Sequence, residues 1–147
     1  MTVIRVMTAS DYDGVYDLWI HTPGMGLNTT DDSREGVETY LKRNPSTCFV
    51  AEADGRIVGV IMAGHDGRRG YIYHTAVRLD FRKQGIGKRL VEHAMAALEK
   101  EGISKAALVA FRSNEVGNGF WEKIGFSERD DLVYRNKNIC PLKRIDT

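Results

Sequence analysis

The sequence lacks the features that mark membrane and disulfide-rich proteins. Its 147 residues contain no apolar run near the ~18 residues that a membrane span needs. Residues 1–6 are too short an apolar stretch for a signal peptide. The two cysteines, Cys48 and Cys140, are too few for a disulfide framework. We therefore expect a cytoplasmic protein without a membrane partner, in which Cys48 is a buried free thiol.

The chain also lacks an excess of charge of either sign. Lysine and arginine number 21 against 20 acidic residues, which leaves a net charge of +1. General nucleic-acid binders carry a strong basic excess, so no nucleic-acid partner is expected. Hydrophobic residues at 42% and charged residues at 28% are ordinary globular usage. No linker or repeat divides the chain, and we expect a single domain over residues 1–147.

Strand and helix patterns alternate along the chain. Strands are expected over 2–6, 47–52, 56–63 and 71–77, with a tight turn at Asp54-Gly55. A buried crossover strand over 106–110 and short strands around Phe126 and over 132–134 complete the expected sheet. Helices are expected to begin near four residues: Ser10, Asp32, Gly85 and Asn114. This order predicts an α/β fold, with a mixed, mostly antiparallel central sheet of six to seven strands and helices on both faces.

Residues 75–90 carry the chemically informative pattern, in which a strand leads into a basic, glycine-containing loop and a helix start. A helix N-terminus exposes unpaired N–H groups that accept phosphate oxygens. Arg82, Lys83, Lys88 and Arg89 add positive charge, although an ordinary solvated helix start explains them too. A dinucleotide-binding fingerprint requires glycine where Leu90 stands, and a Walker loop requires Ser or Thr where Arg89 stands. Neither of those phosphate loops fits.

Two motifs resemble those of the GCN5-related N-acetyltransferase (GNAT) family. Its acetyl-CoA motif has Arg or Gln, two residues, Gly, one residue, and Gly or Ala. The matching residues here are Arg82-Lys83-Gln84-Gly85-Ile86-Gly87. The family's second motif is an Asn followed by a helix that ends in an aromatic pair and Gly-Phe. The matching residues here are Asn114, Phe120-Trp121 and Gly125-Phe126. The expected order of elements is similar to that family over essentially the whole chain.

The resemblance implies an acetyl-CoA-dependent N-acetyltransferase without a metal. Main-chain N–H groups between Arg82 and Lys88 would hold the CoA pyrophosphate. The pantetheine arm would pair with the strand end at Ala76 and Val77, and the Val77 N–H would stabilise the oxyanion. Asn114 would contact the pantetheine, although its alternative role is a helix cap. The expected cofactor-binding residues are Ala76, Val77, Arg82, Lys83, Gln84, Gly85, Ile86, Gly87, Lys88, Asn114 and Trp121.

The familiar catalytic side chains of the family are replaced here. Trp121 stands where many members have the tyrosine that protonates the CoA thiolate. Val109 stands where ribosomal-protein acetyltransferases have a catalytic Glu, and Tyr71 occupies an acid–base position of the histone-type members. Tyr73 is our substitute candidate, because Tyr71, Tyr73 and Thr75 alternate on one strand face. The alternative is that these tyrosines are strand formers packed against a helix, and His74 is expected on the opposite face in a structural role.

The reaction expected is direct attack of a primary amine on bound acetyl-CoA in a ternary complex, because no activated nucleophile is apparent. The acceptor is a small metabolite amine or a protein amine. We expect it to enter near residues 23–26, where Asp31, Asp32 and Glu35 could attract a cation, although capping of the helix by acids in its first turn explains them too. A catalytically weak CoA-binding sensor is the alternative function. A homodimer is left open by the sequence.

Overall fold

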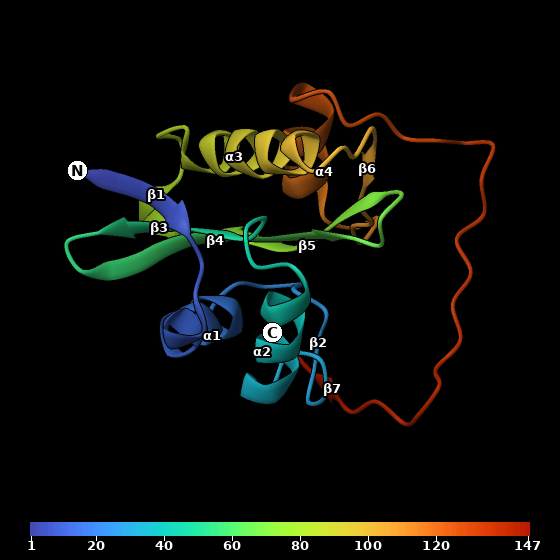
Figure 1. The fold of residues 1–147 in the computed structure, drawn as a ribbon, viewed down its shortest axis with the longest axis horizontal. Coiled ribbons are helices and arrows are strands. Elements are labelled where there is room, and N and C mark those ends of the chain that lie inside the picture. Colours follow the sequence, from blue (N-terminus) through green and yellow to red (C-terminus); the bar gives the residue numbers. More distant parts are fainter.

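The computed structural model describes residues 1–147 and has helices on both sides of one central sheet (Figure 1). The sheet contains five strands in the order β1-β3-β4-β5-β6. Their bounds are Thr2–Val6 for β1, Phe49–Ala53 for β3, Arg56–His65 for β4, Gly70–Val77 for β5 and Ala106–Ala107 for β6. Only the β5–β6 pair is parallel. The mixed, mostly antiparallel α/β fold is confirmed.

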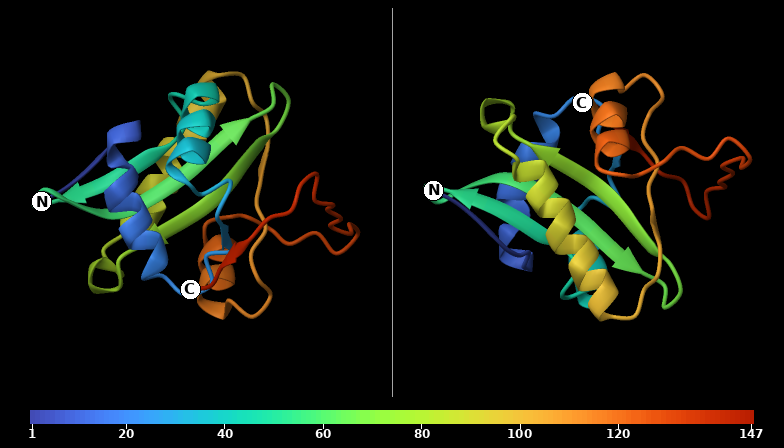
Figure 2. Two further views of the ribbon diagram at one scale, coloured as in Figure 1. Left: turned by 90° about the horizontal axis from the view of Figure 1, so that it is seen from below. Right: turned by 90° about the horizontal axis from the view of Figure 1, so that it is seen from above.

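The helices are divided between the two faces of the sheet. Helices α1 (Tyr12–Ile20) and α2 (Arg34–Arg43) cover one face, and α3 (Ile86–Lys100) crosses the other (Figure 2). Helix α4 (Glu115–Lys123) lies on the α3 side, where Phe120 and Trp121 pack against the core. None of these four helices combines the length and apolarity that a bilayer crossing requires.

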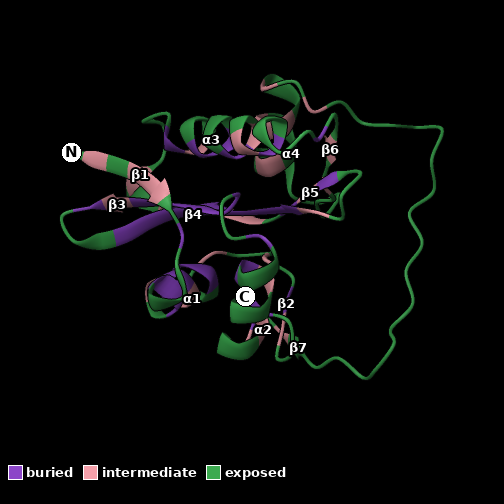
Figure 3. Cartoon of the chain, viewed as in Figure 1, coloured by how far each residue is buried: buried purple, intermediate pink, exposed green.

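Strand β4 divides the apolar interior into two cores. Successive strand residues point to opposite faces, so Val60 and Met62 join the core under α1 and α2. Ile61 and Ala63 join the core under α3. The strand is buried along most of its length (Figure 3). Because helices cover both faces of the sheet, the neighbouring strand β5 is held in a fixed position.

The predicted count of six to seven strands in the central sheet is wrong. Two further strands, β2 (Leu27–Asn28) and β7 (Arg144–Ile145), pair with each other in a separate small sheet. The strands expected around Phe126 and over 132–134 do not form. Residues 127–143 instead run outside the domain and are exposed (Figures 1 and 3). The apolar run of 132–134 follows charged residues that pair locally, such as Arg129 with Asp131 at 2.8 Å.

Two other boundaries differ from expectation. The strand predicted over 106–110 ends at Ala107, although its parallel pairing with β5 agrees with the predicted crossover. Helix α2 is capped by Ser33, whose hydroxyl accepts the Gly36 N–H at 3.0 Å, and not by Asp32. Asp32 is buried in a different contact, described below.

Candidate functional site

The edge of β5 that faces β6 is open over most of its length. The two strands pair only through Gly70 and Tyr71, whereas β5 pairs with β4 from Gly70 to Val77. The edge over residues 72–77 therefore presents main-chain groups without a neighbouring strand, although side chains already donate to the carbonyls of Tyr73, His74 and Val77. Such a row of groups can pair with an extended ligand. It contains Ala76 and Val77, the two residues expected to hold the pantetheine.

The loop between β5 and α3 brings unpaired N–H groups together. The first helical hydrogen bond of α3 runs from the Arg89 N–H to the Gly85 carbonyl at 3.0 Å. The N–H groups of Ile86, Gly87 and Lys88 therefore have no partner within the helix. Gly85 has φ 78°, and a Cβ atom placed there would meet nothing within 4 Å. The N-terminus of α3 thus faces open space, which suits an incoming phosphate.

The remaining loop residues have separate roles. Ile86 is the first residue of α3, and its side chain is buried between this helix and the sheet. Only its backbone therefore faces the loop. Gly87 allows close packing, since a Cβ atom there would lie 3.3 Å from two Phe120 ring carbons. Arg82 donates its Nε–H to the Val77 carbonyl at 3.1 Å, which ties the loop to the end of β5. Lys83, with φ 63°, and Gln84 are exposed.

The second motif is mainly engaged in local structure. The Asn114 side chain accepts the Gly117 N–H at 2.9 Å and caps α4, which is the alternative role expected for it. Trp121 packs edge-on against Phe126, with ring centroids 5.2 Å apart. Val109, at the family's glutamate position, lies on the loop after β6 and is exposed.

Three tyrosines gather on the α2 side of β5. The rings of Tyr71 and Tyr73 lie 4.7 Å apart, and Tyr40 of α2 meets Tyr73 edge-on at 5.8 Å. Tyr73 is 46% exposed. Partial burial, with nearby Tyr134 and Asp31, raises the pKa of Tyr73. Its phenol is therefore protonated at neutral pH and can donate a proton.

A bulge in β5 changes the predicted alternation. Ile72 joins the core under α3, whereas Ala76 joins the core under α1, although four residues should return to the same face. The pairing with β4 shifts register in this stretch, and His74 has φ 32°. The shared face of Tyr71 and Tyr73 therefore does not extend to Thr75.

His74 contacts the α1 and α2 side, so its predicted position on the opposite face is wrong. Its Nε2 lies 2.8 Å from the Oδ1 of Asp32, whose side chain is 4% exposed. The imidazole also meets Trp19 of α1 edge-on at 5.1 Å. Sequence reasoning missed this pair, because 42 residues separate its members and no local pattern connects them.

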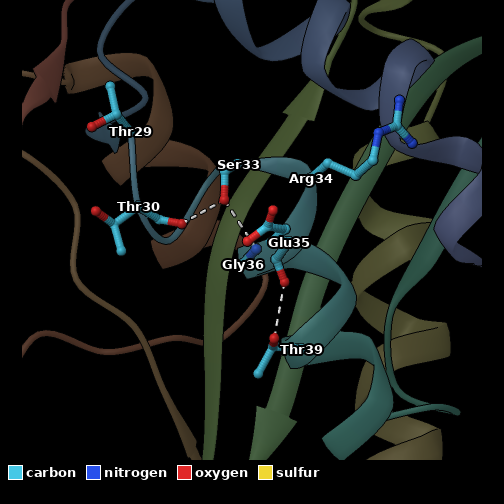
Figure 4. Close-up of a pocket in the computed structure, with 7 residues that line it drawn as sticks. All are labelled: Thr29, Thr30, Ser33, Arg34, Glu35, Gly36 and Thr39. Carbon is cyan, nitrogen blue, oxygen red and sulfur yellow. Dashed lines mark hydrogen bonds between the residues drawn. The ribbon is translucent and has the colours of Figure 1, made fainter.

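A polar hollow of about 600 Å³ lies along the start of α2 (Figure 4). It contains no hydrophobic lining residue. The lining residues are Thr29, Thr30, Ser33, Arg34, Glu35, Gly36 and Thr39. Two of its hydroxyls are engaged locally, since Ser33 donates to Thr30 O and accepts from Gly36, and Thr39 donates to Glu35 O. The hollow borders the segment where we expect the acceptor to enter.

Comparisons with known proteins identify the family. The model of the acetyltransferase (GNAT) family matches residues 12–126. The chain belongs to the GNAT acetyltransferase family. A relative named acetyltransferase, from Yersinia enterocolitica, is 32% identical over 136 residues, which are 92% of this chain and 95% of that relative. The chain is thus an acetyltransferase.

Solved structures share the fold of this acetyltransferase. The PaiA N-acetyltransferase of Thermoplasma acidophilum, in complex with coenzyme A, has a TM-score of 0.78 at 21% identity and covers 88% of this chain and 92% of its own. An acetyltransferase of Clostridium acetobutylicum with acetyl-CoA has a TM-score of 0.71 at 18% identity, over 92% and 96% of the two chains. At these identities the likeness concerns the fold.

Two further observations bear on the chemistry of the acetyltransferase. Burial raises the pKa of the Cys48 thiol to about 12, and its side chain is 1% exposed. A buried, protonated thiol is a poor nucleophile. No group of three or more His, Cys, Asp or Glu side chains is arranged to hold a metal ion.

Proposed function

We propose that this acetyltransferase moves the acetyl group of acetyl-CoA to a primary amine by direct attack in a ternary complex. The observation that carries the proposal is the open edge of β5, which leads directly into the unpaired N–H groups at the start of α3. An extended arm and a pyrophosphate need these two features in this order. Acetyl-CoA has both parts.

The donor is held mainly by main-chain atoms in this proposal. The amides between Arg82 and Lys88 bind the pyrophosphate, and Ala76 and Val77 pair with the pantetheine like an added strand. The exposed side chains of Lys83 and Lys88 add countercharge. The Val77 N–H stabilises the oxyanion, a contribution whose loss typically costs ~10²–10³ in rate. Asn114 and Trp121 complete the donor site from the second motif.

A direct transfer agrees with the absence of an available thiol nucleophile at Cys48. Holding the amine and the thioester in attack geometry can supply ~7–11 kcal/mol, whereas acid–base help adds ~10²–10⁴ in rate. Tyr73 supplies the acid, because its phenol is protonated and nearly half exposed on β5. It takes over the task that Trp121 cannot perform.

The acceptor amine enters from the α1–α2 side, and it is a small metabolite amine or a protein amine. The exposed acid Asp31 lies close enough to Tyr73 to affect its pKa. Glu35 lines the hollow at the start of α2. These carboxylates attract a cationic amine toward the tyrosines. A cytoplasmic location and the lack of a nucleic-acid partner stay predictions. Whether the protein forms a homodimer stays open.

Thiol release from acetyl-CoA, measured against a panel of amines and lysine-containing peptides, tests the proposal alongside calorimetric binding of CoA. We expect CoA binding and amine-dependent turnover. Binding without turnover across the whole panel would replace the proposal with the sensor function. Absence of CoA binding would refute both.

Replacing Tyr73 by phenylalanine tests the acid. The change removes the phenolic proton and keeps the ring, so we expect the transfer rate to fall at least ~tenfold with CoA affinity unchanged. Tyr16→Phe is the matched control, since Tyr16 is another tyrosine of the domain and stacks on Tyr12 within α1. An unchanged rate in Tyr73→Phe removes this residue from the mechanism.

A further inference from the structure

We propose that His74, held by Asp32, is the base that takes the proton from the attacking amine. This inference rests on the proposed amine acetylation and adds a catalytic residue to it. His74 lies in the bulge of β5, three residues before Val77, which is ~10 Å along the strand. The imidazole therefore belongs to the same strand whose open edge presents the donor.

The imidazole is fixed from two sides. A carboxylate only accepts hydrogen bonds, so the 2.8 Å contact means that Nε2–H of His74 donates to Asp32. Trp19 packs edge-on against the ring, and its indole N–H donates to the His74 carbonyl at 3.3 Å. A ring held in this way cannot rotate freely about its side-chain bonds.

Asp32 is itself immobilised. Its second oxygen, Oδ2, accepts the Asn28 N–H at 2.8 Å, and its carbonyl accepts the Tyr12 hydroxyl at 2.7 Å. The carboxylate therefore sets the tautomer of His74, with the proton on Nε2 and the lone pair on Nδ1. Nδ1 has no hydrogen-bond partner, and no buried side-chain nitrogen or oxygen is left unpaired, so Nδ1 reaches solvent. This nitrogen is free to accept a proton.

The backbone conformation of His74 also supports a catalytic role for this residue. With φ 32°, a residue with a Cβ atom is strained, and such strain gathers at active sites. Here the strained conformation turns the imidazole toward Asp32, away from the face that regular alternation would give it. Regular alternation would place His74 in the core under α3.

The proton balance is complete without another reactant. The amine, which enters as a cation, first gives one proton to solvent. Its neutral nitrogen then attacks the thioester carbonyl, and a C–N bond forms while the carbonyl oxygen takes the electron pair. His74 Nδ1 removes one proton from the new ammonium, and the C–S bond breaks as the carbonyl re-forms. The thiolate leaves and takes a proton from the Tyr73 phenol, which regains one from solvent, and His74 Nδ1 returns its proton to solvent. The products are the N-acetylated amine and CoA.

His74→Gln tests the base, because glutamine can still donate to Asp32 while lacking the imidazole. We expect the turnover number to fall ~100-fold, with the CoA dissociation constant and the thermal unfolding midpoint unchanged. The control is His65→Gln, which makes the same change at a comparable contact, that between His65 Nε2 and Glu101 at 2.6 Å, at the opposite end of the β4–β5 hairpin. We expect that control to turn over normally. A normal rate in His74→Gln overturns the proposal.

Asp32→Asn tests the positioning role of the carboxylate. We expect a fall of ~tenfold in the wild-type background and no further fall when the change is added to His74→Gln, because the two residues act as a unit. A purely structural Asp32 would lower the rate of both backgrounds by the same factor, and that result overturns its positioning role.

Two checks keep the outcomes separate. If His74→Gln is unfolded, carbethoxylation is applied to a protein carrying His21→Gln, His65→Gln and His93→Gln, in which His74 is the remaining histidine. Continued transfer after modification overturns the proposal. If the wild-type protein acetylates no amine, the proposed function itself fails and the inference falls with it. Wild-type turnover with an undiminished His74→Gln variant refutes the inference alone.

Discussion

Replacing Gly85 by alanine separates the conformation of the donor loop from its charge. Gly85 has φ 78°, and its added Cβ would meet nothing within 4 Å, so the substitution creates strain without a clash. The left-handed conformation costs alanine ~1–2 kcal/mol, and lower entropy of the unfolded chain returns ~0.4–1 kcal/mol. The free energy of unfolding should fall by about 1 kcal/mol, which lowers the melting temperature by about 2–4 °C.

The same change should weaken CoA binding. An alanine that relaxes out of the left-handed region tilts the following N–H groups away from the pyrophosphate. Loss of one hydrogen bond to a charged group costs ~1.5–3 kcal/mol, or roughly 10–100-fold in the dissociation constant. Calorimetric titration with CoA measures this change. Gly85→Asn, which tolerates the left-handed region better, should lose less affinity than Gly85→Ala.

Gly102 provides the matched control. It follows α3 with φ 83°, and a Cβ there would also meet nothing within 4 Å. Gly102→Ala should lower stability by the same amount as Gly85→Ala and leave CoA affinity unchanged. Equal losses of affinity in both variants, or none in Gly85→Ala, would refute the role assigned to the loop.

Three other perturbations have defined outcomes. Ser33→Ala removes the cap of α2 and should lower the free energy of unfolding in urea by about 1 kcal/mol; no change would mean that water replaces the cap. Burial acts to raise the pKa of Asp11, but hydrogen bonds, chiefly from Arg5, prevail and lower it. The stability that Asp11 contributes is therefore present above about pH 4 and lost as the pH falls below it. The free energy of unfolding of Asp11→Asn, measured with urea, should decrease less on acidification than that of the wild type. A thiol reagent should titrate only Cys140 in the native protein and Cys48 as well after denaturation; rapid reaction of both would contradict the burial of Cys48.

Local chemistry explains the parts of the fold that the sequence predicts well. The Asp54-Gly55 pair accepts positive φ at both residues, 52° and 73°, and joins β3 to β4 as expected. The four-residue spacing from Ile86 through Leu90 to Leu98 gives α3 one buried stripe. These features depend on residues close together in the chain, so composition and spacing reveal them.

Tertiary contacts explain what the sequence does not predict. The bulge at His74 places a residue with a Cβ atom at positive φ, and no turn motif in the sequence predicts this conformation. The pairing of His74 with Asp32 depends on how α1, the segment before α2 and β5 meet in space. Residues 132–134 look like a strand, yet a strand forms only where a neighbour offers hydrogen bonds, and none does so here.

The bond from Arg82 to the Val77 carbonyl has a consequence for the protein on its own. An exposed β-edge is a template on which other chains can add and aggregate. The guanidinium occupies an acceptor at the very end of that edge, and a positive charge there repels another basic strand end. The Arg82 side chain thus removes one acceptor that another chain could otherwise use at this edge.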